Sequence, residues 1–198
     1  MKHNHVLAIK TDGSLYAWGD NSEGAVAEAT FSDQLIPFST GVQNVKYVDA
    51  GYSRSLAIIG DDNEVWAWGD NTVYTLGNDS IPSGSNSTVP VPVQVAYSHT
   101  FLKDAVAVAS GSSHSVALTE SGVVMAWGFN GDGELGQGHN KLRDYLGPDT
   151  GETIPFDPSK ANPVSIPGRV VAIATGFNHT LALTDDGTVW AGRIAMEK

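Results

Sequence analysis

The sequence predicts an all-β protein, a partial β-propeller of about three to four four-stranded antiparallel blades. Three observations support this: a segment that recurs along the chain, short strands rich in β-branched and aromatic residues, and Gly, Asp and Asn in the turns between them. No stretch of the chain shows a sustained helical period. With 198 residues, 41% of them hydrophobic, the chain can bury a core.

Each copy of the segment carries related residues at corresponding positions. A histidine or arginine begins each copy, Trp-Gly ends three of them, and a small residue with Gly precedes three. The repeat positions are His5, Trp18, Gly19, Gly51, Arg54, Trp68, Gly69, Gly111, His114, Trp127, Gly128, Gly176, His179 and Trp190. The fourth copy lacks the Trp before Gly192. Because a copied residue is normally architectural, we expect the Trp side chains in the core between blades and the His rings hydrogen-bonded to a neighbouring backbone group.

The strands of one unit are predicted at 45–50, 55–59 and 64–68, with Gly-containing turns between them. A fourth strand is expected after each insertion, and the prolines in or beside these segments suit an outer edge strand. The predicted fourth strands are 35–38, 91–96 and 163–166. The small residues before Gly51, Gly111 and Gly176 are expected near a central axis.

We expect a single repeat domain over 1–198. Its units are predicted at 1–44 (incomplete), 45–104, 105–168 and 169–198 (incomplete). The first unit has no inner strand before His5, so the end blades are expected to expose apolar faces through which the chain could self-associate.

Residues 111–138, which read GSSHSVALTESGVVMAWGFNGDGELGQG, resemble the repeat of the regulator of chromosome condensation (RCC1) family. The WD repeat would instead end a shorter unit with Trp-Asp. The resemblance implies a ring of about seven blades, of which this chain would form a part. It also implies, for founding members, guanine nucleotide exchange on a small GTPase and docking on chromatin. The exchange residues lie outside the repeat, so none is assigned to this chain.

The composition argues against several partners. The net charge is −11 and Lys and Arg form no run, whereas nucleic-acid binding depends on cations that neutralise phosphates. The absence of cysteine excludes disulfides and thiolate metal sites. No apolar segment reaches the ~18 residues of a spanning helix. We therefore expect no nucleic acid and no membrane as partner. A cytoplasmic location is favoured, and a secreted or cell-surface location within a longer parent is the alternative.

Motifs of enzyme and metal chemistry fail on their context. Residues 131–136 match GxGxxG, but no helix follows them. Asn130, Asp132 and Glu134 alternate like calcium ligands, but the sixth and twelfth loop positions lack Gly and Glu. The Asp-Asn pairs at 20–21 and 70–71 are expected to stabilise turns. We expect no enzymatic activity, with no catalytic residue, no metal and no cofactor.

The insertions at 72–89 and 137–161 are the predicted functional segments, because long loops on a rigid scaffold usually carry contacts, with disorder as the alternative. The predicted partner-binding residues are Tyr74, Asn78, Asp79, Arg143, Tyr145, Phe156 and Lys160. The function this predicts is a non-enzymatic protein-interaction scaffold with a protein partner. The alternatives are a guanine nucleotide exchange factor-like regulator of a small GTPase and an inhibitor of an extracellular enzyme.

Overall fold

The computed structural model describes residues 5–140, 145–146, 153–154 and 156–192. These residues form strands, turns and loops, and they contain no helix. Accordingly, no helix long and apolar enough to span a membrane occurs in them. The all-β prediction is confirmed.

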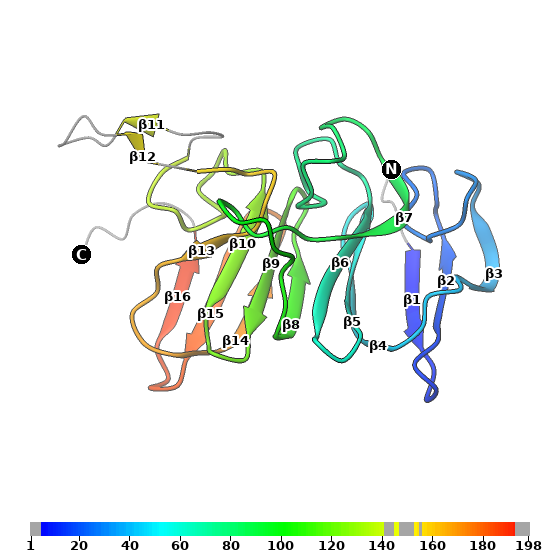
Figure 1. Ribbon diagram of the computed structural model, residues 1–198, viewed down its shortest axis with the longest axis horizontal. Coiled ribbons are helices and arrows are strands. Elements are labelled where there is room, and N and C mark those ends of the chain that lie inside the picture. The colour runs from blue at the N-terminus through cyan, green and yellow to red at the C-terminus, as the bar shows by residue number, and fades with distance from the viewer. Residues whose placement is uncertain (1–4, 141–144, 147–152, 155, 193–198) are drawn as a thin grey trace.

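Four antiparallel sheets follow one another in chain order along the long axis of the molecule (Figure 1). The first sheet contains β1 (His5–Ile9), β2 (Leu15–Gly19) and β3 (Gln34–Ser39). The second contains β4 (Val45–Ala50), β5 (Arg54–Ile59), β6 (Glu64–Gly69) and β7 (Ser87–Pro92). The third contains β8 (Ala105–Ser110), β9 (His114–Thr119), β10 (Val124–Gly128) and β13 (Asn162–Val164). The fourth contains β14 (Val170–Thr175), β15 (Thr180–Thr184) and β16 (Val189–Gly192). A short hairpin pairs β11 (Tyr145–Leu146) with β12 (Thr153–Ile154).

Strand order within the complete sheets is β4-β5-β6-β7 and β8-β9-β10-β13. The first strands of successive sheets contact one another, β4 with β8 and β8 with β14. The proline-bearing strands β7 and β13 lie at the opposite edge, where a missing backbone N–H does not interrupt the sheet. The architecture is a partial β-propeller, as predicted.

The outer strand of the second sheet lies earlier than predicted. The sequence favours 91–96, whereas β7 is Ser87–Pro92. The following segment leaves the sheet: after Val93 N donates to Val65 O, Gln94 pairs with Phe101 and Val95 with Ala161. This crossing segment therefore links the second sheet to the third instead of lengthening β7.

Side chains alternate between the two faces of each strand, and both faces of the middle sheets are buried. On β5, Leu56 and Ile58 belong to the cluster between the second and third sheets, whereas Ala57 packs toward the first sheet. On β9, Val116 likewise packs toward the fourth sheet and Ala117 toward the second. These strands therefore fill the space between blades.

The interface between two successive sheets is called here a joint. The indoles of Trp68 and Trp127 each lie in one joint and are fully buried. Each indole donates its N–H to a carbonyl in the loop of the preceding blade: Trp68 to Ala25 O at 2.8 Å and Trp127 to Thr75 O at 3.0 Å. A buried indole needs such an acceptor, so each loop carbonyl fixes one ring. Trp18 is only half-buried, because it shares with Val6 the face of the first sheet that points away from the second.

Glycines allow the inner strands to approach closely. A Cβ added at Gly51 would lie 2.3 Å from Ser110 Oγ, and one added at Gly111 would lie 2.9 Å from Gly176 O. Any side chain at Gly51 or Gly111 would therefore push neighbouring blades apart. This agrees with the prediction that these segments lie near the axis.

Replacing Trp127 by Ala is expected to destabilise the chain by about 3–5 kcal/mol, because the change empties the joint between the second and third sheets. The measurement is the free energy of unfolding in urea. Val189→Ala, at a side chain 58% exposed on β16, is the control and should change stability by less than about 0.5 kcal/mol. Similar small losses for both variants would contradict the joint described here.

Candidate functional site

The two ends of the sheets differ in the segments that form them. The turns that join β1 to β2, β5 to β6, β9 to β10 and β15 to β16 form one end, called here the turn end (Figure 1). The opposite end, called the loop end, is formed by 20–33, 51–53, 70–86, 111–113, 129–140 and 176–178. The long insertions therefore belong to the loop end.

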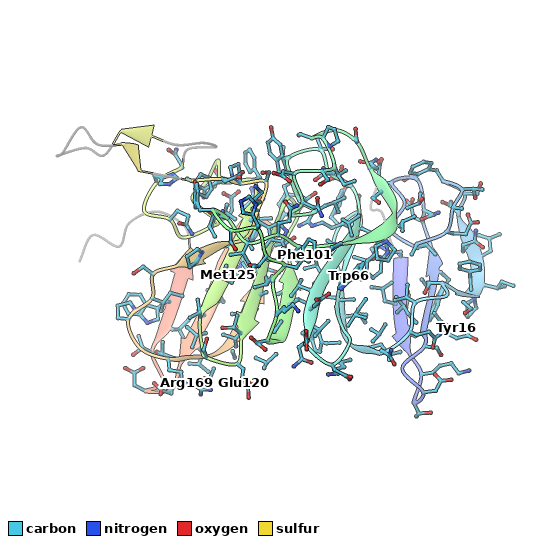
Figure 2. The ribbon with its side chains drawn as sticks, in the orientation of Figure 1. Tyr16, Trp66, Phe101, Glu120, Met125 and Arg169 are labelled. Atoms are coloured by element: carbon cyan, nitrogen blue, oxygen red, sulfur yellow. The ribbon has the colours of Figure 1, made fainter. Side chains whose placement is uncertain are left out.

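Basic side chains are concentrated at the turn end. Figure 2 shows Arg169 with Glu120 at this end, where the guanidinium donates to Glu120 O at 3.1 Å. The other basic residues of the turn end are Lys10, Lys46 and Lys103. In the described part of the chain only Arg54 and Lys160 remain, and Arg54 is buried while Lys160 pairs with Asp79 at 2.8 Å.

Acidic side chains are numerous at the loop end. They are Asp20, Glu23, Glu28, Asp33, Asp70, Asp79, Asp132, Asp157 and the buried Glu134. Acidic side chains therefore outnumber the two described cations at this end, Arg54 and Lys160, which favours a negative potential there.

An aromatic pair lies in the middle of the loop end. Tyr52 follows β4 and Phe177 follows β14, and their rings meet edge to face with centroids 6.2 Å apart. Tyr52 is 41% exposed and Phe177 is 67% exposed. These two large exposed rings come from the second and fourth blades, and they contact each other beside the third blade, so they form a surface suited to binding.

Hydrogen bonds hold this aromatic pair in place. Ser112 N donates to Phe177 O at 2.9 Å, and Ser112 Oγ donates to Asn178 Oδ1 at 2.9 Å. The amide of Asn178 in turn donates to Asp132 Oδ2 at 3.0 Å. Tyr52, Asp70, Asp132, Phe177 and Asn178 are called here the aromatic–acidic face. Asp70 belongs to it because its N–H donates to Ser53 O, beside Tyr52.

Buried asparagines fix the loops that carry the acidic residues. Asn21, Asn71 and Asn130 occupy the same place after Trp-Gly, and each is at most 1% exposed. Each side-chain oxygen accepts a backbone N–H five residues later, and each amide donates to a carbonyl farther along the loop. These bonds agree with the predicted role of these residues in stabilising turns, because each Asn side chain connects two segments of its loop.

The repeated His and Arg positions form a polar belt across the joints. His5 Nε2 lies 2.8 Å from Ser55 Oγ, and His114 Nε2 lies 3.0 Å from Thr180 Oγ1. The partner is thus a hydroxyl of the next blade, and the predicted backbone partner is wrong for these rings. Each hydroxyl donates onward to a loop carbonyl, so Nε2 carries the proton in both rings.

Arg54 takes the place of histidine in this belt, and its longer side chain bonds several groups of the next blade. Its guanidinium donates to Ser112 O at 2.8 Å, Gly111 O at 2.9 Å and His114 O, and Nε donates to Ser115 Oγ at 3.1 Å. Burial lowers the pKa of Arg54 to about 10, and the carboxylates of Asp70 and Asp49 oppose that effect. Arg54 is therefore cationic at neutral pH and clamps the turn beside the aromatic–acidic face.

Burial lowers the pKa of His5 and His114 from 6.5 to about 4, with Arg54 and His179 adding to the effect at His114. Both rings are neutral at pH 7, which suits a donor to a hydroxyl. His179 occupies the same repeat position in the fourth sheet, directly before β15, and is exposed.

The predicted insertion residues divide into three groups. Asp79 and Lys160 are brought together as the ion pair that joins the two insertions, and Tyr74 is half-buried nearby. Asn78 is 8% exposed and its amide donates to Pro92 O. Phe156 is 2% exposed and packs in the core against His139, so its side chain is a core group rather than a contact.

Arg143 lies outside the described residues, and Tyr145 is described only as part of β11. Their predicted contacts remain predictions. Sequence reasoning missed Tyr52 and Phe177. The available signal was that the residue after the inner-strand glycine is aromatic in two copies and Ser112 in the third, so it is not copied as the repeat positions are.

No group of three or more His, Asp or Glu side chains that could hold a metal ion occurs within the described ranges.

The sheets, joints and belt define an arc of propeller blades. Two family models, both described as the regulator of chromosome condensation (RCC1) repeat, match residues 62–118 and residues 2–25, 105–134 and 170–191. The chain belongs to the RCC1 repeat family.

Related proteins match most of this chain. Protein pim1 of Schizosaccharomyces pombe is 28% identical over 95% of the chain and 35% of its own length. The ultraviolet-B receptor UVR8 of Arabidopsis thaliana is 26% identical over 94% of the chain and 38% of its length. The human E3 ubiquitin-protein ligase HERC2 is 32% identical over 89% of the chain and 3% of its length. The chain therefore spans between 3% and 38% of the length of these relatives.

Solved structures show the same fold. Yeast RCC1 (Prp20), in a structure with Kap60, superposes with a TM-score of 0.75 at 22% identity, over 95% of this chain and 41% of that one. Human WBSCR16 superposes with a TM-score of 0.69 at 20% identity, over 95% of this chain and 45% of that one.

The belt histidines make stability depend on pH. Their pKa is lower in the folded chain than the 6.5 of a free ring, so unfolding takes up protons between pH 6.5 and pH 4. The stabilisation that these neutral rings provide is fully present above pH 6.5. As the pH falls toward 4, the free energy of unfolding decreases by up to about 3 kcal/mol for each ring. His114→Asn lacks this ring and should lose less stability than the wild type as the pH falls. The difference in unfolding free energy between the two proteins should therefore shrink from pH 6.5 to pH 4, measured by urea unfolding at several pH values.

His99→Asn, at an exposed loop histidine, is the matched control and should leave the pH profile of the wild type unchanged. A gap between His114→Asn and the wild type that stays constant from pH 6.5 to pH 4 would show that the ring of His114 does not become harder to protonate on folding.

Proposed function

We propose that this chain is a non-enzymatic protein-interaction module that binds a basic segment of a protein partner on its aromatic–acidic face. The observation that carries the proposal is the exposed pair Tyr52 and Phe177 within an acidic loop end whose described cations are buried or paired.

The chemistry of the face fits Lys and Arg side chains. An ammonium or guanidinium gains from the faces of aromatic rings and from nearby carboxylates such as Asp70 and Asp132. Residues on the acidic loops are held by Asn71 and Asn130, so the face is largely preformed. A preformed face loses little conformational entropy on binding.

Relatives supply a precedent for protein partners. Yeast RCC1 (Prp20) is bound to Kap60 in one structure, and a second structure of Prp20p is described with its binding properties to Gsp1p and histones. These are properties of Prp20. They support a protein partner for this chain, and the choice of a basic segment rests on the charges of the loop end.

The neighbouring insertions extend the proposed surface. Asp79 and Lys160 lie on the same end, and their ion pair ties the loop after β6 to the segment before β13. Tyr74, Asp79 and Lys160 are therefore proposed as peripheral contacts. Asn78 and Phe156 are left out because their side chains are buried.

The test is titration of a fluorescent Lys- and Arg-rich peptide, with the same peptide carrying Glu at every basic position for comparison. We expect saturable binding of the basic peptide alone, weakening as salt rises. The double variant Tyr52→Ser with Phe177→Ser should weaken binding about tenfold or more, because aromatic anchors dominate such contacts. Asp70→Asn with Asp132→Asn should weaken binding less and flatten its salt dependence.

A matched control removes two charges from the turn end by Asp61→Asn with Asp185→Asn, both at exposed positions. This variant has the same net charge as the loop-end variant and should bind as the wild type does. Equal weakening by the two charge variants would mean that the peptide responds only to overall charge, and the proposed face would be abandoned.

A further inference from the structure

The joint between the third and fourth sheets lacks a side chain that the other joints contain. Across from Ser55 on β5 lies Trp68, and across from Ser115 on β9 lies Trp127. The corresponding partner of Thr180 on β15 is Gly192. The fourth sheet therefore has no indole at this repeat position.

The surroundings of the indole are nevertheless retained. Glu134 O occupies the loop position at which Ala25 O and Thr75 O accept an indole N–H. Thr180 Oγ1 donates to Glu134 O at 3.0 Å, as Ser55 Oγ donates to Ala25 O at 2.8 Å. The acceptor side of this joint is thus built like the others.

Two equivalent glycines show the difference directly. A Cβ at Gly77 would lie 2.8 Å from Nε1 of Trp127 and 2.9 Å from Val93 Cγ1. A Cβ at Gly136, with nearly the same φ, would lie 2.9 Å from Val164 Cγ1 and near no indole. Val164 thus takes the place of Val93, but no indole lies beside Gly136 as Trp127 lies beside Gly77.

A cavity of about 710 Å³ occupies this joint. Its size lies within the range of small-molecule sites, about 300–1,000 Å³. Apolar side chains of β10 and β15, such as Val124 and Ala182, line it together with Trp190. Nε1 of this lining residue, Trp190, is buried without a hydrogen-bond partner in the described structure, so the site contains a donor that lacks an acceptor.

The charges of the wall restrict the ligand further. Asp132 and Glu134 line the cavity, and none of the described lining residues is Lys or Arg. An anionic ligand would be repelled, whereas a neutral or cationic one would not.

We propose that this cavity is a binding site for a planar, bicyclic nitrogen heteroaromatic ligand, neutral or positively charged. Its ring N–H faces Glu134 O in the place of the missing indole, and a ring nitrogen accepts from Nε1 of Trp190. The site lies between blades and shares Asp132 with the aromatic–acidic face, but its ligand is a different one from the partner proposed for that face.

The test uses three rings of similar shape in isothermal titration against the chain. Benzimidazole has both a donor and an acceptor nitrogen, indole has only the donor, and indene has neither. Affinity should fall in that order, with benzimidazole about tenfold or more tighter than indene, because each lost hydrogen bond leaves a buried polar group unpaired. Benzimidazole-5-carboxylate should bind more weakly than benzimidazole.

Three variants distinguish binding in this cavity from nonspecific binding elsewhere on the protein. Gly192→Trp restores the missing indole and should raise the melting temperature and abolish benzimidazole binding. Val189→Trp adds the same ring on the opposite face of β16, at a residue outside the cavity lining, and should leave binding intact. A Cβ at Gly192 would lie 3.0 Å from Glu134 O, so Trp190→Phe provides a second variant that keeps an aromatic ring. It should remove the preference for benzimidazole over indole.

The proposal would be overturned by no saturable binding of benzimidazole, by equal binding of the three rings, or by the same loss of binding in Gly192→Trp and Val189→Trp. A preference for benzimidazole that survives Trp190→Phe would do the same. None of these results depends on the peptide titration at the loop end, so the two proposals succeed or fail separately.

Discussion

The structure depends on the joint between successive sheets. Each joint combines an apolar layer, in which alternate residues of strands such as β5 and β9 face opposite neighbours, with a polar belt that crosses the gap. The apolar layer supplies most of the stabilisation, since it removes the largest area from water. The belt and the indole N–H bonds set the position of one blade on the next, because their hydrogen bonds join groups of adjacent blades.

The same constraint explains where function is expected. Residues copied in each blade, such as Trp68 and His114, are committed to the joints and are unavailable to a partner. Residues that differ between copies lie at the loop end, where Tyr52 and Phe177 contact each other and are not part of a joint. Where the repeat itself is broken, as at Gly192, the joint opens into a cavity. Both proposals therefore arise from departures from the repeat.

The sequence predicts the repeat-encoded part of the molecule well. Strand positions, the burial of Trp127 and the close approach at Gly51 follow from copied patterns and local turn chemistry. It does not predict contacts between units. The crossing of 94–96 to the third sheet, the hydroxyl partners of the belt histidines and the burial of Phe156 depend on how neighbouring blades meet. The pairing of Tyr52 with Phe177 joins residues far apart in the chain, and no local signal encodes it.

The most direct test of this account is a double-mutant cycle across one joint, with His114→Ala, Thr180→Ala and the double variant compared by urea unfolding. His114 and Thr180 lie on successive blades and meet through one hydrogen bond of 3.0 Å. The account predicts a coupling energy of about 1 kcal/mol, because either single change already removes the bond. Additive effects within experimental error would contradict it, since they would mean that the belt does not connect neighbouring blades.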